Sequence, residues 1–557
     1  MFLRETVIRK AGGEYRYWRL VKTYWDKKLK KVRHKSIAQL GKLTPEEVTL
    51  FKKTLSGQAG KSFGWEELKA RKSYEYLGAA ILDRIWEYWE LNEVAGGGVA
   101  EVLAINRCLS PKSDYQVSAW YEETILPKLL GVNINPTRVY RALDELYALT
   151  DKIQEHLYSK IQKLKLDDYA LIFYDITSSY FEESSCEFVR YGLSRDHRRD
   201  KKQIILALAV TKKGFPFYWK VFPGNMADTK TVKEFVSELR ERFKIKKACL
   251  VMDKGMVSKG NLEKVEETEF DYVVTLRRSS IGKIADMPWR YLRSITEDNV
   301  DRKKDYFQYR SRRAYFKELN RQGNVRYILC FNPEKFLQER KDRGAKIESI
   351  KKHLDKRNTA LAGAKKKRNV EILREELKKY LEKRAAKKMV KFRLMSKGNS
   401  YQIKYRLVEK EIKEAAKLDG VWVIQSNVPK AGPGELIDAY SNRMEIERSF
   451  HNLKSFVEIR PLYHHHNEER IKAHVNVCVL GYLLNRTVTH LVRQKKDFEE
   501  LTAQSVYNCL RSCKLVELAA GSEKRLKITA STKEQVKLTG ILADKDLLEE
   551  SKIQQLL

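Results

Sequence analysis

The chain is poor in cysteine, in long apolar runs, and in acidic residues to balance its basic ones. Its seven cysteines among 557 residues are scattered and form no CxxC pair, so we expect neither a disulfide framework nor a cysteine-based zinc module, and we expect a reducing compartment. The start of the chain lacks the apolar core of a signal peptide. No run of about 18 uncharged apolar residues occurs, so no membrane span is expected. The longest apolar stretch, VNVCVLGYLL (475–484), predicts a buried helix. These features favour a cytoplasmic protein.

Basic residues are abundant. Lys and Arg number 110 against 74 Asp and Glu, which gives a net charge of +36 and a pI near 9.6. Such an excess favours a polyanionic partner, with nucleic acid the first choice. The alternative is a basic surface that only keeps the protein soluble, but +36 exceeds the charge that solubility requires. The apolar content of 42% is that of a globular protein, and the length allows several domains.

The first third of the chain divides into a strand-rich part and a helical part. EYRYWRLVKTYW and VRHKSIAQLG predict strands within residues 1–42. A helix is expected to begin at Pro45, with Thr44 as its cap. Residues 65–160 predict helices, among them YEYLGAAILDRIWEYW, VAEVLAINRCL and TRVYRALDELYAL. This basic helical module is compatible with docking on DNA and equally with a simple packing unit.

Residues 169–280 have the pattern of an α/β core. YALIFYDIT is a short buried strand that carries Asp175, and it is followed by a hairpin of IILALAV and FPFYWKVF and by the helix TKTVKEFVSELRERF. ACLVMDKG is a further buried strand that ends near Asp253, before the helix NLEKVEE and the strand DYVVTL. The strand VWVIQSN (421–427) then precedes a helix with Glu447.

Between about residues 281 and 415 this pattern breaks. YFQYRSRRAYF and VRYILCF predict strands, and residues 333–388 form a highly charged stretch with helical spacing. Such a charge run indicates either a solvated helix face or a basic arm that touches DNA.

Three acids stand where this order of elements can bring them together. If the strand that ends near Asp253 lies beside the strand of Asp175, the two aspartates meet, and a helix packed across the sheet can deliver Glu447. A carboxylate inside an apolar strand is costly unless it is paired or binds a metal. Taken singly, each acid would more often be a strand-end, turn or solvent-facing residue, and Glu445 is a nearby competitor of Glu447.

Three hard oxygen ligands suit Mg²⁺, for which Mn²⁺ can substitute. Two such ions roughly 3.5–4 Å apart would activate an attacking water or 3′-hydroxyl and stabilise the leaving oxygen of a phosphodiester. The sequence therefore predicts a two-ion site at Asp175, Asp253 and Glu447. His464, His465 and His466 cannot all face one ion from a regular element, so we interpret them as a polar loop cluster.

A stripe of side chains accompanies the last acid. Tyr440, Arg443, Glu447 and Lys454 have the spacing Y-x2-R-x3-E-x6-K. On one α-helix these offsets fall within a narrow sector. One helix face would then present a carboxylate for a metal ion, and two cations and a phenol for the phosphate that the metal activates. This is the equipment of a site that cuts phosphodiesters.

These motifs carry a family resemblance that covers most of the chain. The chain resembles the DDE transposases of bacterial insertion sequences, in the subgroup with a Y-R-E-K signature. YDIT and VMDKG match the first two acids, and GLSRDHRRDKKQ (192–203) and FPGNMADTKT (222–231) are also similar to the family. The resemblance implies an α/β catalytic core with an RNase H-like mixed sheet flanked by helices and interrupted by a long insertion. A small N-terminal β region and a helical module precede this core.

The resemblance also implies a function. Such enzymes bind the terminal inverted repeats of double-stranded DNA, cut both strands and join the freed 3′-ends to target DNA. We therefore expect a cut-and-paste transposase that is nucleoid-associated and forms a homodimer in its DNA complex. Two alternatives are a DDE nuclease that cuts without strand transfer and a non-catalytic DNA-binding protein of transposase descent.

Roles for single residues follow from the same resemblance. The three acids become metal ligands. Arg443 and Lys454 become phosphate holders, Arg443 with a bidentate grip, and Tyr440 becomes a hydrogen-bond donor to phosphate.

Two further groups of residues are expected to touch DNA. Arg195, Arg198 and Lys201, within residues 192–203, are expected to contact phosphates; the alternative is a flexible polar loop. Trp422 is placed like a tryptophan that holds a flipped base in related members with a hairpin intermediate; the alternative is a core residue.

The predicted domain organisation has six parts: a β-rich N-terminal region (1–60), a helical, DNA-binding module (61–160), the first part of the core (161–280), an insertion of strands and long charged helices (281–415), the second part of the core with the Glu447 helix (416–495), and a C-terminal helical region (496–557).

Overall fold

A computed structural model describes the chain except for a set of short segments: residues 11–12, 27–29, 56–67, 114–115, 167–170, 197, 303–306, 310–313, 320, 322, 365–367, 399, 460–466, 521–522 and 557. The chain forms two compact units. The first consists of Met1–Ile245 and Met444–Leu557, and the second of Lys246–Arg443. The chain thus leaves the first unit and later returns to it.

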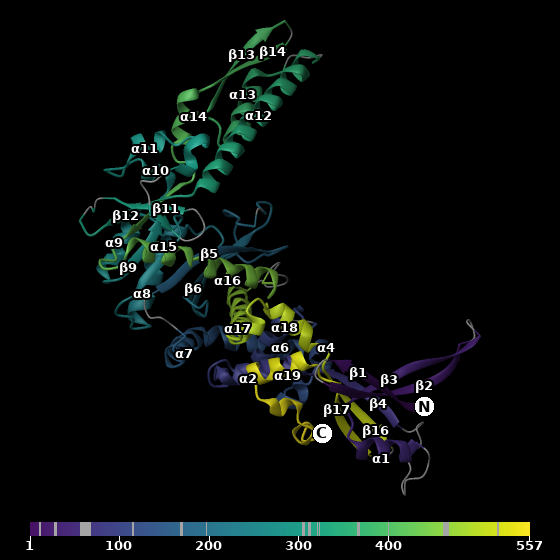
Figure 1. Cartoon of the computed structure of the whole chain (residues 1–557). Helices are drawn as coiled ribbons and strands as arrows, with labels where there is room; N and C mark the ends of the chain where they lie inside the picture. The colour runs from purple at the N-terminus through teal and green to yellow at the C-terminus, as the bar shows by residue number, and fades with distance from the viewer. Residues whose placement is uncertain are drawn as a thin grey trace. The chain divides into compact units, whose positions relative to one another are not determined.

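The N-terminal part of the first unit is rich in strands, as predicted, and the structure shows that they form a three-stranded antiparallel sheet in the order β1-β2-β3 (Figure 1). Its strands are β1 (Phe2–Lys10), β2 (Gly13–Asp26) and β3 (Lys31–Gly41). Helix α1 (Pro45–Leu55) begins at the predicted proline. The backbone N–H of Glu47 donates to Thr44 Oγ1 at 3.2 Å, and the N–H of Thr44 donates to Glu47 Oε2 at 2.9 Å. This reciprocal capping box confirms Thr44 as the helix cap.

The predicted helical module is largely confirmed. Its helices are α2 (Leu77–Tyr88), α3 (Gly98–Leu109), α4 (Val117–Glu122), α5 (Leu126–Leu130), α6 (Pro136–Ala148) and α7 (Thr150–Lys163). The long helix α17 (Glu468–Arg493) packs against α3 and α6. Residues 475–484 are all buried in it, which confirms the predicted buried helix.

The expectation of helices throughout residues 65–160 is wrong at one segment. Residues Leu68–Glu75 form strand β4, which pairs with β16 (Lys514–Ala520) in the sheet order β17-β16-β4. β16 and β17 (Glu523–Ile528) are strands within residues 496–557, for which a helical region was expected. A strand whose partner lies more than 400 residues away has no local signal for pairing. Helices α18 (Ala503–Leu510), α19 (Lys533–Leu542) and α20 (Glu550–Gln554) complete the C-terminal region.

The first unit also contains the predicted hairpin-linked strands. β5 (Leu171–Tyr180), β6 (Gln203–Thr211) and β7 (Pro216–Pro223) are antiparallel, and almost every residue in them is buried. Continuous apolar runs of this kind suit strands covered on both faces. Helix α8 (Asp228–Glu241) follows β7.

The second unit is built on a mixed sheet. β8 (Cys249–Met252), α9 (Lys259–Glu267) and β9 (Asp271–Thr275) are the predicted strand, helix and strand, and the structure shows that the two strands are parallel. β15 (Val421–Ser426) lies antiparallel between β9 and β12 (Arg326–Phe331), and β11 (Ala314–Glu318) and β10 (Phe307–Tyr309) extend the order outward. Along the chain, three antiparallel strands followed by helix, strand, helix and strand reproduce the expected order, and the mixed α/β fold class is confirmed.

The charged stretch is helical. α12 (Pro333–Ala362) and α13 (Val370–Lys383) lie beside a hairpin of β13 (Val390–Lys397) and β14 (Ser400–Leu407) (Figure 1). One buried stripe, which includes Ile350, Leu354 and Leu377, joins these elements. The rest of the surface of both helices is largely exposed, which is compatible with both interpretations of the charge run. Short helices α10 (Arg278–Ile281), α11 (Trp289–Arg293) and α14 (Glu409–Ala416) complete the insertion.

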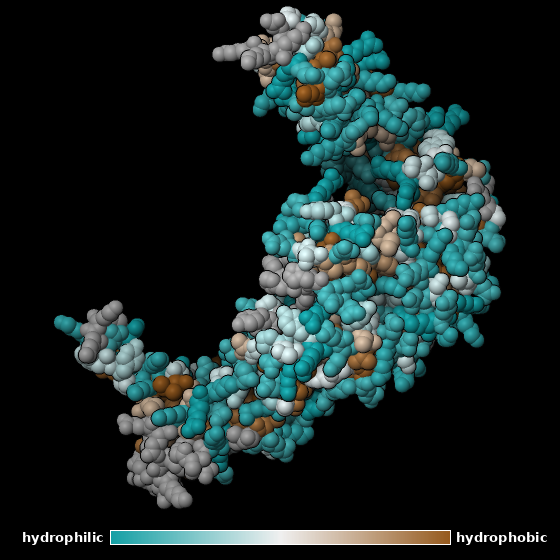
Figure 2. All heavy atoms as spheres, turned by 180° about the vertical axis from the view of Figure 1, so that it is seen from behind, coloured by the Kyte–Doolittle hydropathy of each residue, from teal (hydrophilic) through white to brown (hydrophobic). Residues whose placement is uncertain are grey.

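The surface reflects the composition. Hydrophilic residues dominate the face shown in Figure 2, where hydrophobic residues occur as small scattered patches. No described helix is long and apolar enough to cross a membrane.

Candidate active site

The first unit carries two of the three predicted acids. Asp175 lies half-buried in the middle of β5, between the buried residues Tyr174 and Ile176. Its Oδ1 accepts a hydrogen bond from the backbone N–H of Ile176 at 2.8 Å. Glu447 is exposed on α16 (Met444–Ser455), a helix that packs against β5 and β6. Both acids thus lie on adjoining elements.

Helix α16 is anchored through its buried face. Ser449 Oγ lies 2.6 Å from the hydroxyl of Tyr482 on α17, and this hydroxyl donates to the carbonyl of Gly214 at 2.6 Å. Glu445 is engaged by Arg448 and lies 3.7 Å from Arg486 of α17. Glu445 therefore belongs to the ion pairs that support the helix.

The second unit carries the third acid. Asp253 directly follows β8, as predicted, and Nη1 of Arg443 lies 3.1 Å from its Oδ1. The hydroxyl of Tyr440 is 2.8 Å from Thr275 Oγ1 at the end of β9, and the guanidinium of Arg443 lies 5.3 Å from the centre of the Tyr440 ring. Because β8 and β9 are parallel neighbours, their carboxyl ends bring these groups to the same edge of the sheet.

The prediction of one continuous helix for the Y-R-E-K stripe is wrong. α15 covers Pro433–Ser441 and α16 begins at Met444, so Tyr440 lies on α15, Arg443 lies in the turn, and Glu447 and Lys454 lie on α16. The backbone N–H of Arg443 bonds to the carbonyl of Tyr440 at 3.1 Å, a three-residue spacing that tightens the helix end. Offsets of 3, 7 and 14 define one face only on an unbroken helix.

The two motif segments 192–203 and 222–231 meet backbone to backbone. A Cβ atom on Gly192 would lie 1.9 Å from the carbonyl oxygen of Gly224, which excludes any larger residue at this crossing. The ion pair between Arg195 Nη2 and Asp228 Oδ2, at 2.6 Å, joins the same segments. The backbone N–H of Arg195 also donates to Ser178 Oγ on β5 at 2.9 Å. The segment is therefore attached to the strand that carries the first acid.

The predicted phosphate-binding cations all have carboxylate partners. Lys454 Nζ lies 2.7 Å from Asp196 Oδ1, and the two side chains are only 12% and 3% exposed. Lys201 pairs with Glu182 at 2.7 Å, and the bond to Glu182 raises the pKa of Lys201.

Arg198 completes this set of cations. It pairs with Asp200 at 2.9 Å and lies 5.0 Å from the centre of the Tyr180 ring. These ion pairs attach Arg195, Arg198 and Lys201 to neighbouring carboxylates, and their contact with DNA stays a prediction.

Sequence reasoning missed several supporting residues. Asp196 and Asp228 lie within the two motif segments, and for Asp196 an acid inside a basic cluster was the available signal. Arg277 donates to the carbonyls of Lys254 and Gly255, at 3.1 and 2.9 Å, and so holds the loop that follows Asp253. Nothing near Arg277 in the sequence indicates this role.

The remaining expectations concern Trp422, the histidines and the metal ions. Trp422 is half-buried on β15, with Lys335 Nζ 5.9 Å from its ring centre, and its base-holding role stays a prediction. His464, His465 and His466 lie outside the described residues. Among the described residues, no three or more His, Cys, Asp or Glu side chains are grouped closely enough in this structure to form a metal site by themselves. The carboxylates on β5, after β8 and on α16 have the hard oxygen chemistry that Mg²⁺ and Mn²⁺ prefer.

Comparisons with known proteins agree with the motifs. Residues 168–484 match the family described as "Transposase DDE domain", and residues 3–66 match "IS1634 family transposase, N-terminal domain". No curated protein matches the chain.

Several solved transposase structures are similar at low identity. A piggyBac transposase synaptic complex with hairpin DNA has 9% identity and a TM-score of 0.35, covering 74% of this chain and 70% of that one. A Mos1 transposase paired-end complex has 12% identity and a TM-score of 0.15, covering 31% of this chain and 57% of that one. Scores this low carry no argument, so the assignment depends on the family matches.

The first family match covers more than half of the chain and includes all three acids and the whole Y-R-E-K stripe. It confirms the resemblance drawn from those motifs. The chain belongs to the DDE transposase family of bacterial insertion sequences, enzymes that cleave DNA with divalent metal ions and transfer the cut strands.

Proposed function

We propose that Asp175, Asp253 and Glu447 are the metal ligands of this transposase and hold two Mg²⁺ ions, for which Mn²⁺ can substitute. The observation that carries the proposal is the attachment of Glu447's helix to β5, the strand of Asp175, in the first unit. The second unit adds Asp253 beside Arg443. Bound ions would supply an activated water or 3′-hydroxyl and stabilise the leaving oxygen.

The chain's own cations prepare the site for DNA. Arg443 offsets the charge of Asp253, and its planar guanidinium can also bind a phosphate in a bidentate manner. Lys454, held by Asp196, is a fixed point charge rather than a freely rotating one. Tyr440, bonded to Thr275, presents its phenol at the same sheet edge as Asp253. Arg195, Arg198 and Lys201 extend the positive surface for the DNA backbone, and Trp422 is proposed to hold a flipped base.

The substrate we propose is the double-stranded terminal inverted repeat of the element, and the product is the 3′-end joined to target DNA. Because two ends of the element must be paired, we propose a homodimer in the DNA complex. Its proposed location is the nucleoid in the cytoplasm. The six predicted domains remain part of this proposal, with residues 61–160 docking DNA and the 281–415 insertion contacting ends or the partner.

The test uses a labelled DNA fragment that ends in the terminal repeat of the element. Wild-type protein, Glu447→Gln and the matched control Glu445→Gln are incubated with it in Mg²⁺, in Mn²⁺ and in EDTA. We expect metal-dependent cutting by the wild type and the control, and binding without cutting by Glu447→Gln. Near-normal cutting by Glu447→Gln would refute its role. A supercoiled target plasmid in the same reaction separates strand transfer from simple nuclease activity.

A further inference from the structure

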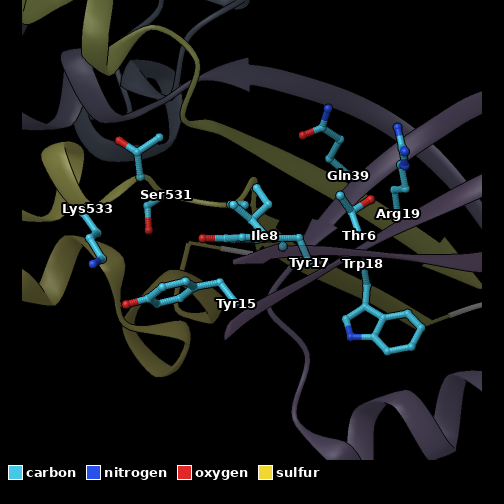
Figure 3. Close-up of a pocket in the computed structure, with 12 residues that line it drawn as sticks. Thr6, Ile8, Tyr15, Tyr17, Trp18, Arg19, Gln39, Ser531 and Lys533 are labelled. Carbon is cyan, nitrogen blue, oxygen red and sulfur yellow. The ribbon is translucent and has the colours of Figure 1, made fainter. Parts of the chain in front are cut away.

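A cavity of about 330 Å³ lies in the first unit, far along the sequence from the catalytic motifs (Figure 3). Its lining comes from all three N-terminal strands and from residues 530–533, which precede and begin α19: Thr6, Ile8, Tyr15, Tyr17, Trp18, Arg19, Gln39, Gly41, Ala530, Ser531, Thr532 and Lys533. These residues include two cations, three aromatic residues and no carboxylate. The volume is that of a small-ligand site.

One face of the N-terminal sheet forms the main wall. Tyr15, Tyr17 and Arg19 alternate along β2 and therefore point to the same side. In register, Ile8 stands opposite Tyr15, and Thr6 stands opposite Tyr17. Figure 3 shows the two tyrosines and Ile8 between Lys533 and Ser531 at one end and Arg19 and Gln39 at the other. The wall is thus an apolar platform with polar and cationic ends.

The opposite face of the same sheet packs into the hydrophobic core. Leu20, Ala38 and Leu40 are buried there against Val516 and Leu518 of β16. The core of this region is therefore complete without Tyr15 and Tyr17, which are only half-buried. Packing alone does not account for the aromatic row on the cavity side.

The C-terminal wall is held in place. Lys527, only 7% exposed, pairs with Glu47 at 2.7 Å. Gly41, at the end of β3, adopts φ +80°, a conformation that favours glycine, and lies beside the backbone of Ala530. The cavity is a built feature of one folded body.

Its chemistry points to an anion with an aromatic part. Nε of Arg19 is buried, and no described residue accepts a hydrogen bond from it. The guanidinium of Arg19 thus brings a cation to the cavity wall with one of its donors left unpaired by the described protein. Lys42 and Lys533 lie 5.2 and 5.0 Å from the centre of the Tyr15 ring, so further positive charge stands beside the aromatic platform.

We propose that this cavity binds one unpaired DNA nucleotide, with its base against Tyr15, Tyr17 and Ile8 and its phosphate at Arg19 or Lys533. Aromatic platforms edged by cations are the usual means of binding unpaired bases, because every base has a π-face. Thr6, Gln39 and Ser531 offer hydrogen-bonding groups for the base edge. The inference rests on the proposed function only in taking DNA as the substrate.

The test measures the affinity of the full chain for two labelled duplexes by fluorescence anisotropy. One duplex is blunt, and the other carries a three-thymidine single-stranded overhang. The variants are Tyr17→Ala, Arg19→Ala and Lys533→Ala. Arg16→Ala and Lys537→Ala are matched controls, because Arg16 lies on the opposite face of β2 paired with Glu5 and Lys537 lies one turn further along α19.

We expect the wild type to prefer the overhang. Tyr17→Ala and Arg19→Ala should weaken overhang binding about tenfold, the effect of losing a stacked base, and blunt binding less than about twofold. The controls should weaken both duplexes equally, through loss of general charge. Lys533 is exposed, so its variant remains informative if the tyrosine variant does not fold.

The absence of an overhang preference, or an equal loss for both duplexes in the cavity variants, would overturn the inference. End cleavage is measured in the same preparations. If cleavage still depends on Glu447 while the cavity variants show no overhang effect, only the cavity inference fails.

Discussion

Replacing Gly192 by alanine tests whether the two motif segments support the site through direct backbone contact. The added Cβ would lie 1.9 Å from the carbonyl oxygen of Gly224 and 2.8 Å from Nε2 of Gln203. Neither the backbone oxygen nor the buried glutamine can move away freely. Gln203 Nε2 donates to that same carbonyl at 2.9 Å, and Gln203 and Arg190 exchange two backbone hydrogen bonds at 2.9 and 3.1 Å.

The expected cost follows from these contacts. Each hydrogen bond that must break contributes about 1 kcal/mol, and overpacking a tight crossing adds about 1–3 kcal/mol. With the three hydrogen bonds of Gln203 lost, we therefore expect Gly192→Ala to destabilise this region by about 4–6 kcal/mol. Because Arg195 and Asp228 lie on the two segments, end cleavage should fall as well.

Hydrogen–deuterium exchange is the suitable assay, since a chain of two units need not unfold in one step. Peptides spanning residues 186–206 and 220–232 should lose protection, while peptides of the second unit should not. Gly540→Ala on α19 is the control: a Cβ there would meet only the side chain of Lys545, at 3.3 Å. It should be neutral or stabilising by up to about 1 kcal/mol. Unchanged protection in Gly192→Ala would refute the reasoning.

Three other perturbations have clear expected outcomes. Burial, followed by the nearby charge of Asp83, raises the pKa of Glu101 to about 10. Between about pH 4.5 and pH 10 the folded chain therefore keeps a proton on Glu101 that the unfolded chain releases. The free energy of unfolding should fall as the pH rises through this range. In Glu101→Gln, the free energy of unfolding should fall less steeply with pH, by on the order of 1 kcal/mol per pH unit. Urea unfolding of both proteins at pH 5 to 9 measures this dependence, and the same dependence on pH in wild type and variant would contradict the prediction. Asp196→Asn removes the carboxylate that holds Lys454 and should slow end cleavage while the affinity for DNA changes little; a loss of affinity with unchanged cleavage would assign the pair to docking. Arg326, only 2% exposed, binds Glu318 and the carbonyls of Val428 and Ala431. Arg326→Met should therefore destabilise the second unit by about 3–5 kcal/mol, as measured by thermal unfolding. Arg326→Lys should not restore the stability, because a lysine cannot reach three acceptors at once.

Patterns that lie within one element were readable from the sequence. β5, β6 and β7 are continuous apolar runs with polar turns between them, and such runs have few alternatives to a buried strand. The acids Asp175 and Asp253 were recognisable because burying a carboxylate in or directly after such a strand costs free energy unless it is paired or binds a metal.

Other features depended on what a segment meets in the fold. The break at Asn442 and Arg443 was invisible, because helical offsets count residues and do not register a turn between two helices. Strand β4 pairs with β16 across more than 400 residues, so its own sequence of mostly polar residues suggested no partner.

The sequence by itself determined the family, the net charge that favours DNA and most helices and strands, and it singled out the three acids that we propose as metal ligands, because these features depend on local periodicity and on side-chain chemistry. Only the tertiary structure decided that Lys454 is held by Asp196, that Gly192 and Gly224 cross without side chains, and that the two chain ends enclose a cavity lined by Tyr17 and Arg19. The physical reason is distance along the chain. Contacts between segments separated by tens to hundreds of residues leave no periodic trace in either one.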